Sequence, residues 1–165
     1  MIKRRRKHTA GKLPPLPRDD GRPAAPIDVG ILPHLLGFNV RRAQIALWRD
    51  FGRTVGEGDV RPGMFSLLVL VERNPGIAQI DLANQLDQDK ATIVGLIDAL
   101  QRRRWVVRRQ SKVDRRRQEI LLTISGQKAL ESLRMEMLEH EARFTRLFTP
   151  AELAQLMALL RRIHP

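Results

Sequence analysis

The sequence predicts a mainly α-helical (α+β) protein in which two short helices and a tight turn precede a β-hairpin, with longer helices at both ends. Three observations predict this order. Apolar residues recur at helical spacing in residues 30–103 and again in 125–163. Strand-like runs at 105–109 and 118–122 flank a strongly charged loop. The 165 residues suffice for one domain with an extension.

The charge of the chain is strongly unbalanced. Its formal net charge is +12, and its sequence pI is about 11.4. This excess indicates an anionic partner, most commonly nucleic acid, because Lys and Arg side chains that neutralise phosphates release condensed counterions. An acidic membrane surface is the rival. No apolar run approaches the roughly 18 residues of a spanning helix, and the basic N-terminus does not resemble a signal peptide. We therefore expect a cytoplasmic protein.

The residues that usually carry catalysis or bind metals form no recognisable pattern. The chain has no cysteine, which excludes disulfides, thiolate metal sites and thiol-based redox sensing. Its histidines are scattered, without an HExxH, P-loop, GxGxxG or GxSxG motif. We expect no enzymatic activity, no cofactor and no metal site.

Four segments can be distinguished along the chain. Residues 1–26 form a basic, proline-containing arm with little apolar material, which predicts a flexible segment. The arm is either a tail that contacts phosphates or a solubilising extension without a defined contact. Residues 27–56 are expected to hold a first dimerisation helix, 57–123 a DNA-binding lobe, and 124–165 further dimerisation helices.

The first long helix is predicted within residues 30–51. Its apolar residues cover more than the single stripe of an ordinary amphipathic helix. Such a helix needs burial on several sides, which one small chain rarely offers. We infer that a partner subunit covers part of it.

The next segment predicts a helix-turn-helix. Pro62 begins one helix, which Asn74, Pro75 and Gly76 end. A short helix over 77–86 and a break at Asp87 and Gln88 follow. Asp89 can then cap a helix that runs to Arg103. The inner face of this last helix is predicted to carry Ile93, Leu96, Ile97 and Leu100. Followed by the β-hairpin, the pair predicts a winged helix.

The loop of the hairpin concentrates positive charge. Lys112, Arg115, Arg116 and Arg117 face a single acid, Asp114, which leaves a formal charge of +3; Arg108 and Arg109 on the first strand raise the hairpin to +5. A narrow, arginine-rich hairpin tip suits the negative potential of a DNA minor groove. Asp114 is expected to set the loop and orient Arg116. The alternative is an ordinary solvated loop.

The C-terminal region predicts two helices. A long helix, with Ser125 as its predicted N-cap, ends before Pro150, and a final helix follows. Their shared apolar face suits core or dimer packing better than a cofactor site. It comprises Leu130, Leu133, Met137, Phe144, Leu147, Leu153, Leu156, Met157 and Leu160.

At this point the chain resembles the MarR-type winged-helix transcriptional regulators. The wing pattern of that family, D-x-R followed by an aliphatic residue and L-T, is met by Asp114, Arg116, Ile120, Leu122 and Thr123, and a turn glycine follows at Gly126. The resemblance extends in helix order over roughly residues 30–163.

This resemblance implies an obligate homodimer that binds a pseudo-palindromic operator in double-stranded DNA, with one recognition helix in each half-site. The base-facing edge of that helix would be Gln88, Lys90, Ala91, Thr92 and Gly95. The sequence departs from the family pattern at three positions. Gly95 replaces a frequent arginine, Ala78 a common serine N-cap, and Arg104 a usual glycine.

The family also implies a small-molecule effector, often aromatic and anionic, bound between the dimerisation helices and the DNA-binding lobe. An aromatic acid or its coenzyme A thioester is our hypothesis. His34 and Arg41 would lie two turns apart on one helix face and hold its anionic group; a polar pair at the dimer interface is the alternative. The candidate lining residues are His34, Phe38, Arg41, Trp48, Arg53 and Phe65. A non-specific architectural nucleic-acid-binding protein remains the competing function.

Overall fold

The computed structural model describes residues 27–55, 60–111 and 117–163. The predicted basic arm lies outside these ranges. The elements in chain order are η1 (Leu32–His34), α1 (Leu36–Thr54), α2 (Pro62–Arg73), β1 (Ile77–Ala78), α3 (Gln79–Gln85), α4 (Lys90–Arg102), β2 (Val106–Gln110), β3 (Gln118–Leu122), α5 (Ile124–Thr145) and α6 (Pro150–Ile163).

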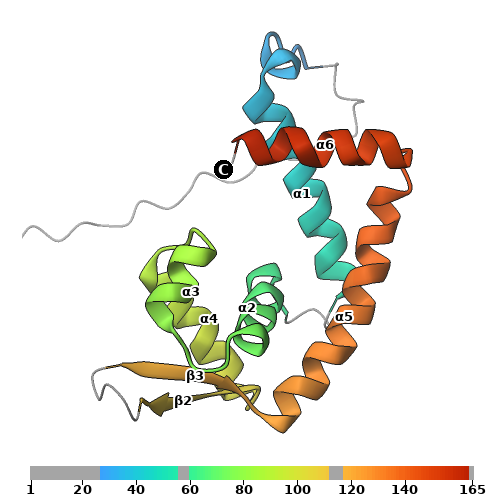
Figure 1. The fold of residues 1–165 in the computed structure, drawn as a ribbon. Helices are drawn as coiled ribbons and strands as arrows, with labels where there is room; N and C mark the ends of the chain where they lie inside the picture. The colour runs from blue at the N-terminus through green and yellow to red at the C-terminus, as the bar shows by residue number, and fades with distance from the viewer. Residues whose placement is uncertain (1–26, 56–59, 112–116, 164–165) are drawn as a thin grey trace, which may run out of the picture.

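The elements form a compact lobe and a helical extension (Figure 1). Helices α2, α3 and α4 pack beside the hairpin β2–β3, and α5 leads from the hairpin along the lobe to α1 and α6. The sheet is antiparallel in the order β1-β3-β2. The predicted mainly helical winged-helix fold is therefore confirmed. None of the described helices combines the length and apolarity needed to cross a membrane.

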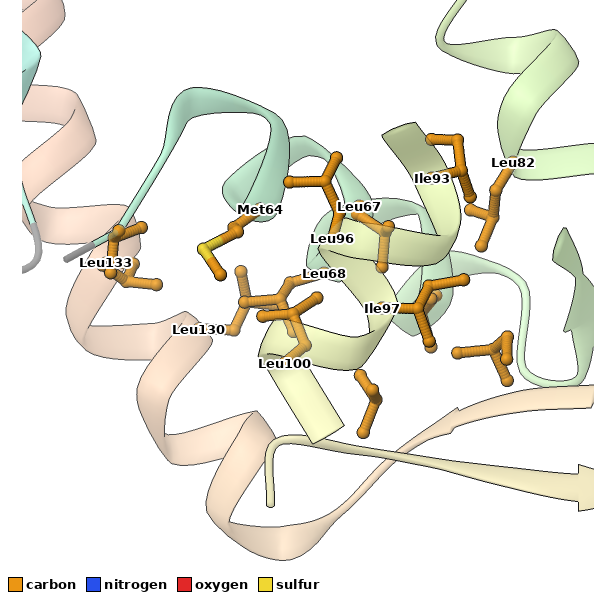
Figure 2. Packing of buried hydrophobic residues seen from close by; sticks show 14 of the residues in the cluster. Met64, Leu67, Leu68, Leu82, Ile93, Leu96, Ile97, Leu100, Leu130 and Leu133 are labelled. Carbon is orange, nitrogen blue, oxygen red and sulfur yellow. The ribbon is translucent and has the colours of Figure 1, made fainter. Parts of the chain in front are cut away.

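The core lies between the three helices of the lobe and the sheet. Figure 2 shows leucine and isoleucine side chains from α2, α3 and α4 meeting at its centre, with Leu130 and Leu133 of α5 on one side. All four residues predicted for the inner face of α4 are buried. Burial of such side chains stabilises the fold by roughly 1.5–3 kcal/mol each. The core thus fixes which face of α4 points outward.

One strand was not predicted. Ile77 and Ala78, expected at the start of a helix, instead form β1, and Ile77 lies opposite Ile120 of β3. Gly76 makes this possible, because it adopts a φ of +85° and its N–H donates to the carbonyl of Ile120 at 3.0 Å. A turn of this kind favours glycine. Ala78 is the N-cap residue of α3, and its methyl side chain has no atom that could accept a hydrogen bond, so α3 has no side-chain cap, as the sequence predicted.

The start of α5 differs from the prediction. Thr123, not Ser125, is the N-cap, since its Oγ1 accepts a hydrogen bond from the N–H of Gly126 at 2.9 Å. The same hydroxyl donates to the carbonyl of Arg104 at 2.6 Å. Ser125 Oγ donates to that carbonyl too, at 2.7 Å. The predicted cap lies two residues too late, because Thr123, the residue directly after β3, already caps α5.

Gly126 lies in the first turn of α5 and is not a turn glycine. A Cβ at this position would stand 1.9 Å from the carbonyl oxygen of Trp105. The glycine therefore permits the backbone of α5 to approach the beginning of the hairpin. Arg104, at the position where the family commonly has glycine, adopts a φ of +59°, a conformation that is uncommon for a residue with a side chain.

The first helical segment is broken. His34 ends the short helix η1, Leu35 is extended, and α1 begins at Leu36. The side-chain amide of Asn39 donates to the carbonyls of Pro33 and Leu35 at 2.8 and 2.9 Å. The first bond satisfies the carbonyl of Pro33, which the break leaves outside a regular helix, whereas the carbonyl of Leu35 also accepts from the backbone N–H of Asn39 at 3.2 Å. The predicted helical spacing between His34 and Arg41 is therefore wrong.

Candidate nucleic-acid interface

The tight turn before α4 orients this helix. Asp87 adopts a φ of +48°, which reverses the chain, and Asp89 caps the helix by accepting from the N–H of Thr92 at 2.9 Å. Thr92 Oγ1 also donates to Asp89, at 2.6 Å. These bonds, that of the Thr92 hydroxyl first, lower the pKa of Asp89 below its ordinary value. The cap predicted from the sequence is confirmed.

The predicted base-facing residues all lie on exposed surface at the beginning of α4. They are Gln88, Lys90, Ala91, Thr92 and Gly95. Thr92 uses its hydroxyl hydrogen in the cap, so it is not free to donate to a base in this arrangement. Val94, which the sequence prediction omitted, is 39% exposed beside them. Its position one turn after Ala91 was the signal that could have identified it.

The base of the wing contacts the helix-turn-helix. Arg117 Nη2 donates to Asp81 Oδ2 of α3 at 2.9 Å, and both side chains are about half exposed. An exposed pair of this kind contributes at most about 1 kcal/mol. The other predicted wing residues, Lys112, Asp114, Arg115 and Arg116, lie outside the described residues. The +3 charge of this loop is a property of the sequence.

Arg108 forms hydrogen bonds with side chains of other elements, which its position in the sequence did not reveal. Its guanidinium donates to Asp98 and Gln101 of α4. Gln79 of α3, with its amide oxygen turned toward this group, accepts from Nε at 2.9 Å. One side chain of β2 therefore joins both helices of the helix-turn-helix. Arg108 does not add a free charge to the hairpin, in contrast to our sequence estimate, whereas Arg109 is exposed.

A second polar cluster joins α1 to α5. His140 of α5 is buried, and its Nδ1 lies 2.8 Å from Asp50 Oδ2 of α1. Arg143 Nε donates to the same oxygen at 2.9 Å. These contacts, that of His140 first, lower the pKa of Asp50. The rings of Phe51 and Phe144 contact His140 edge-on, at 5.7 and 5.3 Å between centroids. This cluster fixes the end of α1 against α5.

The candidate effector residues are distributed over three elements. His34 lies in η1 and Phe65 in α2, where Phe65 packs against the core. The others lie on α1, and among these Arg41 and Arg53 are exposed, as is Trp48 at 57%. Phe38 is half-buried under the guanidinium of Arg42, 5.7 Å from its ring centroid. The break at Leu35 removes the geometric argument that paired His34 with Arg41.

Helices α1 and α6 leave much of their apolar surface exposed. Only Phe51 of α1 is buried, and α6 buries no residue. Large side chains that remain exposed on α6 are Leu156, Met157, Leu159, Leu160 and Ile163. Apolar surface of this extent on a small protein marks an interaction site.

The structure has a helix-turn-helix followed by a basic β-hairpin, and the second helix begins with exposed residues. This combination defines a winged-helix DNA-binding protein. Comparison with known proteins makes this more specific. The model of the MarR family matches residues 61–117, which include α2 to β2 and end directly before β3. A putative transcriptional regulatory protein for the hcr operon of Thauera aromatica is 35% identical over 130 residues, 78% of each chain. The chain belongs to the MarR family of transcriptional regulators.

Solved structures agree with this assignment. The transcriptional repressor CouR bound to a 23-mer DNA duplex is 32% identical, with a TM-score of 0.80 over 86% of this chain and 100% of that one. CouR bound to p-coumaroyl-CoA is 31% identical, with a TM-score of 0.77 over 84% and 97% of the two chains. The resemblance predicted from the wing motif is thus confirmed.

Proposed function

We propose that this protein is a homodimeric, sequence-specific transcriptional repressor that releases its operator when it binds an aromatic acyl-coenzyme A thioester. The exposed apolar surface of α1 and α6 is the observation that supports a dimer. A second copy of the chain would cover this surface. A two-fold dimer presents two copies of α4, which explains a pseudo-palindromic operator with half-sites about one helical turn apart.

The DNA-binding role is assigned to the beginning of α4 and to the wing. Helix α4 would enter the major groove with Gln88, Lys90 and the neighbouring exposed residues. Arg116 and the other wing cations would contact the adjacent minor groove or its phosphates. The net charge of +12 supports strong phosphate binding in addition to base readout.

The effector assignment depends on relatives. CouR, which shares 31% identity with this chain, was solved with p-coumaroyl-CoA. Such a ligand combines an aromatic ring with phosphate groups, and this protein offers exposed aromatic and arginine side chains on α1, among them Trp48 and Arg41. The cluster of Asp50, His140 and Arg143 links α1 to α5, so a ligand that moves α1 would also move the lobe.

DNA binding is tested by fluorescence anisotropy with duplexes from upstream of the gene, against an excess of random duplex at physiological salt. We expect a complex that survives the competitor, with at least about a 10³-fold preference for the operator. Equal competition by random DNA would instead favour a non-specific architectural protein.

The wing is tested by Arg116→Ala. Loss of one phosphate or groove contact should weaken operator binding and reduce the slope of log K against log salt by about one unit. Arg146→Ala, at the end of α5 remote from the hairpin (Figure 1), is the matched control and should leave the slope unchanged. An unchanged slope for Arg116→Ala would contradict the wing assignment.

The effector is tested by thermal shift and by release of labelled operator. We expect aromatic acyl-CoA thioesters to raise the melting temperature and release DNA, because a ligand that binds only the folded state stabilises it. Coenzyme A alone and the free acids are the controls. No shift with any thioester at millimolar concentration would exclude this effector class.

A further inference from the structure

The outward surface of α4 has an apolar patch, and the general DNA-binding role of the helix does not explain this patch. Ile93, Leu96, Ile97 and Leu100 point into the core (Figure 2), so the opposite side of the helix faces away from the protein. The first two turns of that side expose Ala91, Val94 and Gly95. These three residues, spaced at i, i+3 and i+4, form one continuous patch. We call it the apolar face of α4.

This face offers no side-chain hydrogen bond. Ala91, Val94 and Gly95 have no polar side-chain atom, and the neighbouring Thr92 uses its hydroxyl hydrogen to cap the helix through Asp89. One turn further along, Asp98 is bound by Arg108. Guanine and adenine are read most specifically by two hydrogen bonds from one side chain, whereas the C5-methyl group of thymine is read by apolar contact. The face therefore has the chemistry for thymine.

Gly95 supports close approach to a base. A Cβ built on it meets nothing within 4 Å, so packing inside the protein does not require a glycine there. Glycine also disfavours a helix interior relative to alanine. Its presence on an outward face is explained if another molecule approaches the backbone at this point.

We propose that the apolar face of α4 is the specificity-determining element of this regulator, and that Val94 reads the C5-methyl group of a thymine in each half-site while Gly95 leaves space for the base edge. This inference rests on the proposed function, because it requires α4 to lie in the major groove. Lys90 and Gln88, at the beginning of the helix, would then contact the DNA beside the thymine.

The test begins with the full-length protein and a pool of random duplexes, from which the preferred site is selected at physiological salt. Each thymine of that site is then replaced singly by deoxyuridine, which removes only the methyl group. We expect one position per half-site at which the affinity falls about four-fold, because the burial of one methyl group is lost there. In Val94→Ala the same replacement should change affinity less than about two-fold, because the apolar contact is already reduced.

Gly95→Ala is the second variant. It should raise the melting temperature of the free protein, since alanine favours the helix and open space receives its methyl group. It should also weaken binding to the selected site. Ser132→Ala, an exposed helical position on α5, is the matched control and should leave DNA binding unchanged.

The outcomes separate the inference from the function on which it rests. A selected site in which every deoxyuridine is tolerated would overturn the thymine readout and leave sequence-specific regulation intact. An equal deoxyuridine penalty in wild type and Val94→Ala would overturn the assignment to Val94. Failure to enrich any sequence would overturn the proposed function itself.

Discussion

The lobe and the helical extension bury their apolar residues in opposite ways. In the lobe, Leu67 of α2, Leu82 of α3 and Ile97 of α4 are fully buried. In the extension, α6 buries no residue and α1 only Phe51, although both helices are rich in apolar side chains. The comparison teaches that one part of the chain completes its own core, whereas the other presents a core surface that another molecule must complete.

The largest expected effect is on the lobe. Gly126→Ala should lower the free energy of unfolding by about 3 kcal/mol or more, because its methyl group would collide with the carbonyl of Trp105 at 1.9 Å. Urea unfolding measures the change. Gly95→Ala is the control, since it adds the same methyl group where the structure has open space. A similar loss in both variants would show that close packing at Gly126 is not the cause.

Substitutions in the extension should weaken the association of two copies of the chain and should leave the fold of the lobe unchanged. Replacing both Leu156 and Leu160 by glutamate should raise the dimer dissociation constant at least about a hundred-fold, since burying two unpaired charges costs about 3 kcal/mol or more. Sedimentation equilibrium gives this constant, and circular dichroism reports on helix content. Gln155→Glu on the same helix is the control. A variant that stays dimeric would contradict the assignment of α6 to the interface.

The contact between α1 and α5 should depend on pH. The pKa of Asp50 is lowered from 3.8, chiefly by His140. Its stabilising contribution is therefore fully present above about pH 3.8 and is lost as the pH falls through the lower pKa of the folded state. Asp50→Asn should be less stable than wild type at neutral pH, and this difference should shrink as the pH falls below about 3.8.

Urea unfolding midpoints between about pH 6 and pH 3 measure this dependence. Some loss of stability at low pH should remain in Asp50→Asn, because the pKa values of Asp89 and Glu152 are lowered as well. A constant difference between variant and wild type across this range would exclude Asp50 as a titrating link between α1 and α5.

The smallest effect is expected at the base of the wing. Asp81→Asn removes the partner of Arg117, an exposed pair, so stability should change by less than about 1 kcal/mol. Operator affinity should rise a few-fold, because one negative charge is lost near the DNA and one arginine is released. Anisotropy at two salt concentrations measures it, with Glu139→Gln on α5 as the charge-matched control. Unchanged affinity would show that Arg117 and Asp81 act only within the protein.

Much of the lobe could be predicted from the sequence because local signals agreed there. Pro62 begins α2, Asp89 caps α4, and the strand-like runs around the charged loop became β2 and β3. The buried face of α4 followed from helical periodicity alone. The same periodicity failed for Ile77 and Ala78, because pairing with β3 outweighed helical spacing in so short a segment.

The candidate site was predicted less completely. The exposed residues at the beginning of α4 were named correctly as a surface, except that Val94 was omitted. Arg108 was counted toward the positive charge of the hairpin, although its side chain joins β2 to α3 and α4. A sequence reports the charge of an arginine and not its partner, since Asp98 and Gln101 approach it only when the hairpin packs on the helix.

The sequence by itself determined the class of this protein: the wing motif, the helix order and the excess of positive charge identified a MarR-type DNA-binding regulator. The wing motif depends on residues close together in the chain, and the charge and the helix order are read along the chain without any contact between distant segments. The tertiary structure alone decided which side chains remain available. It placed Thr123 as the cap of α5, engaged Arg108 and Asp50 internally, and left the surfaces of α1 and α6 open. These outcomes depend on contacts between distant segments, which no local pattern encodes.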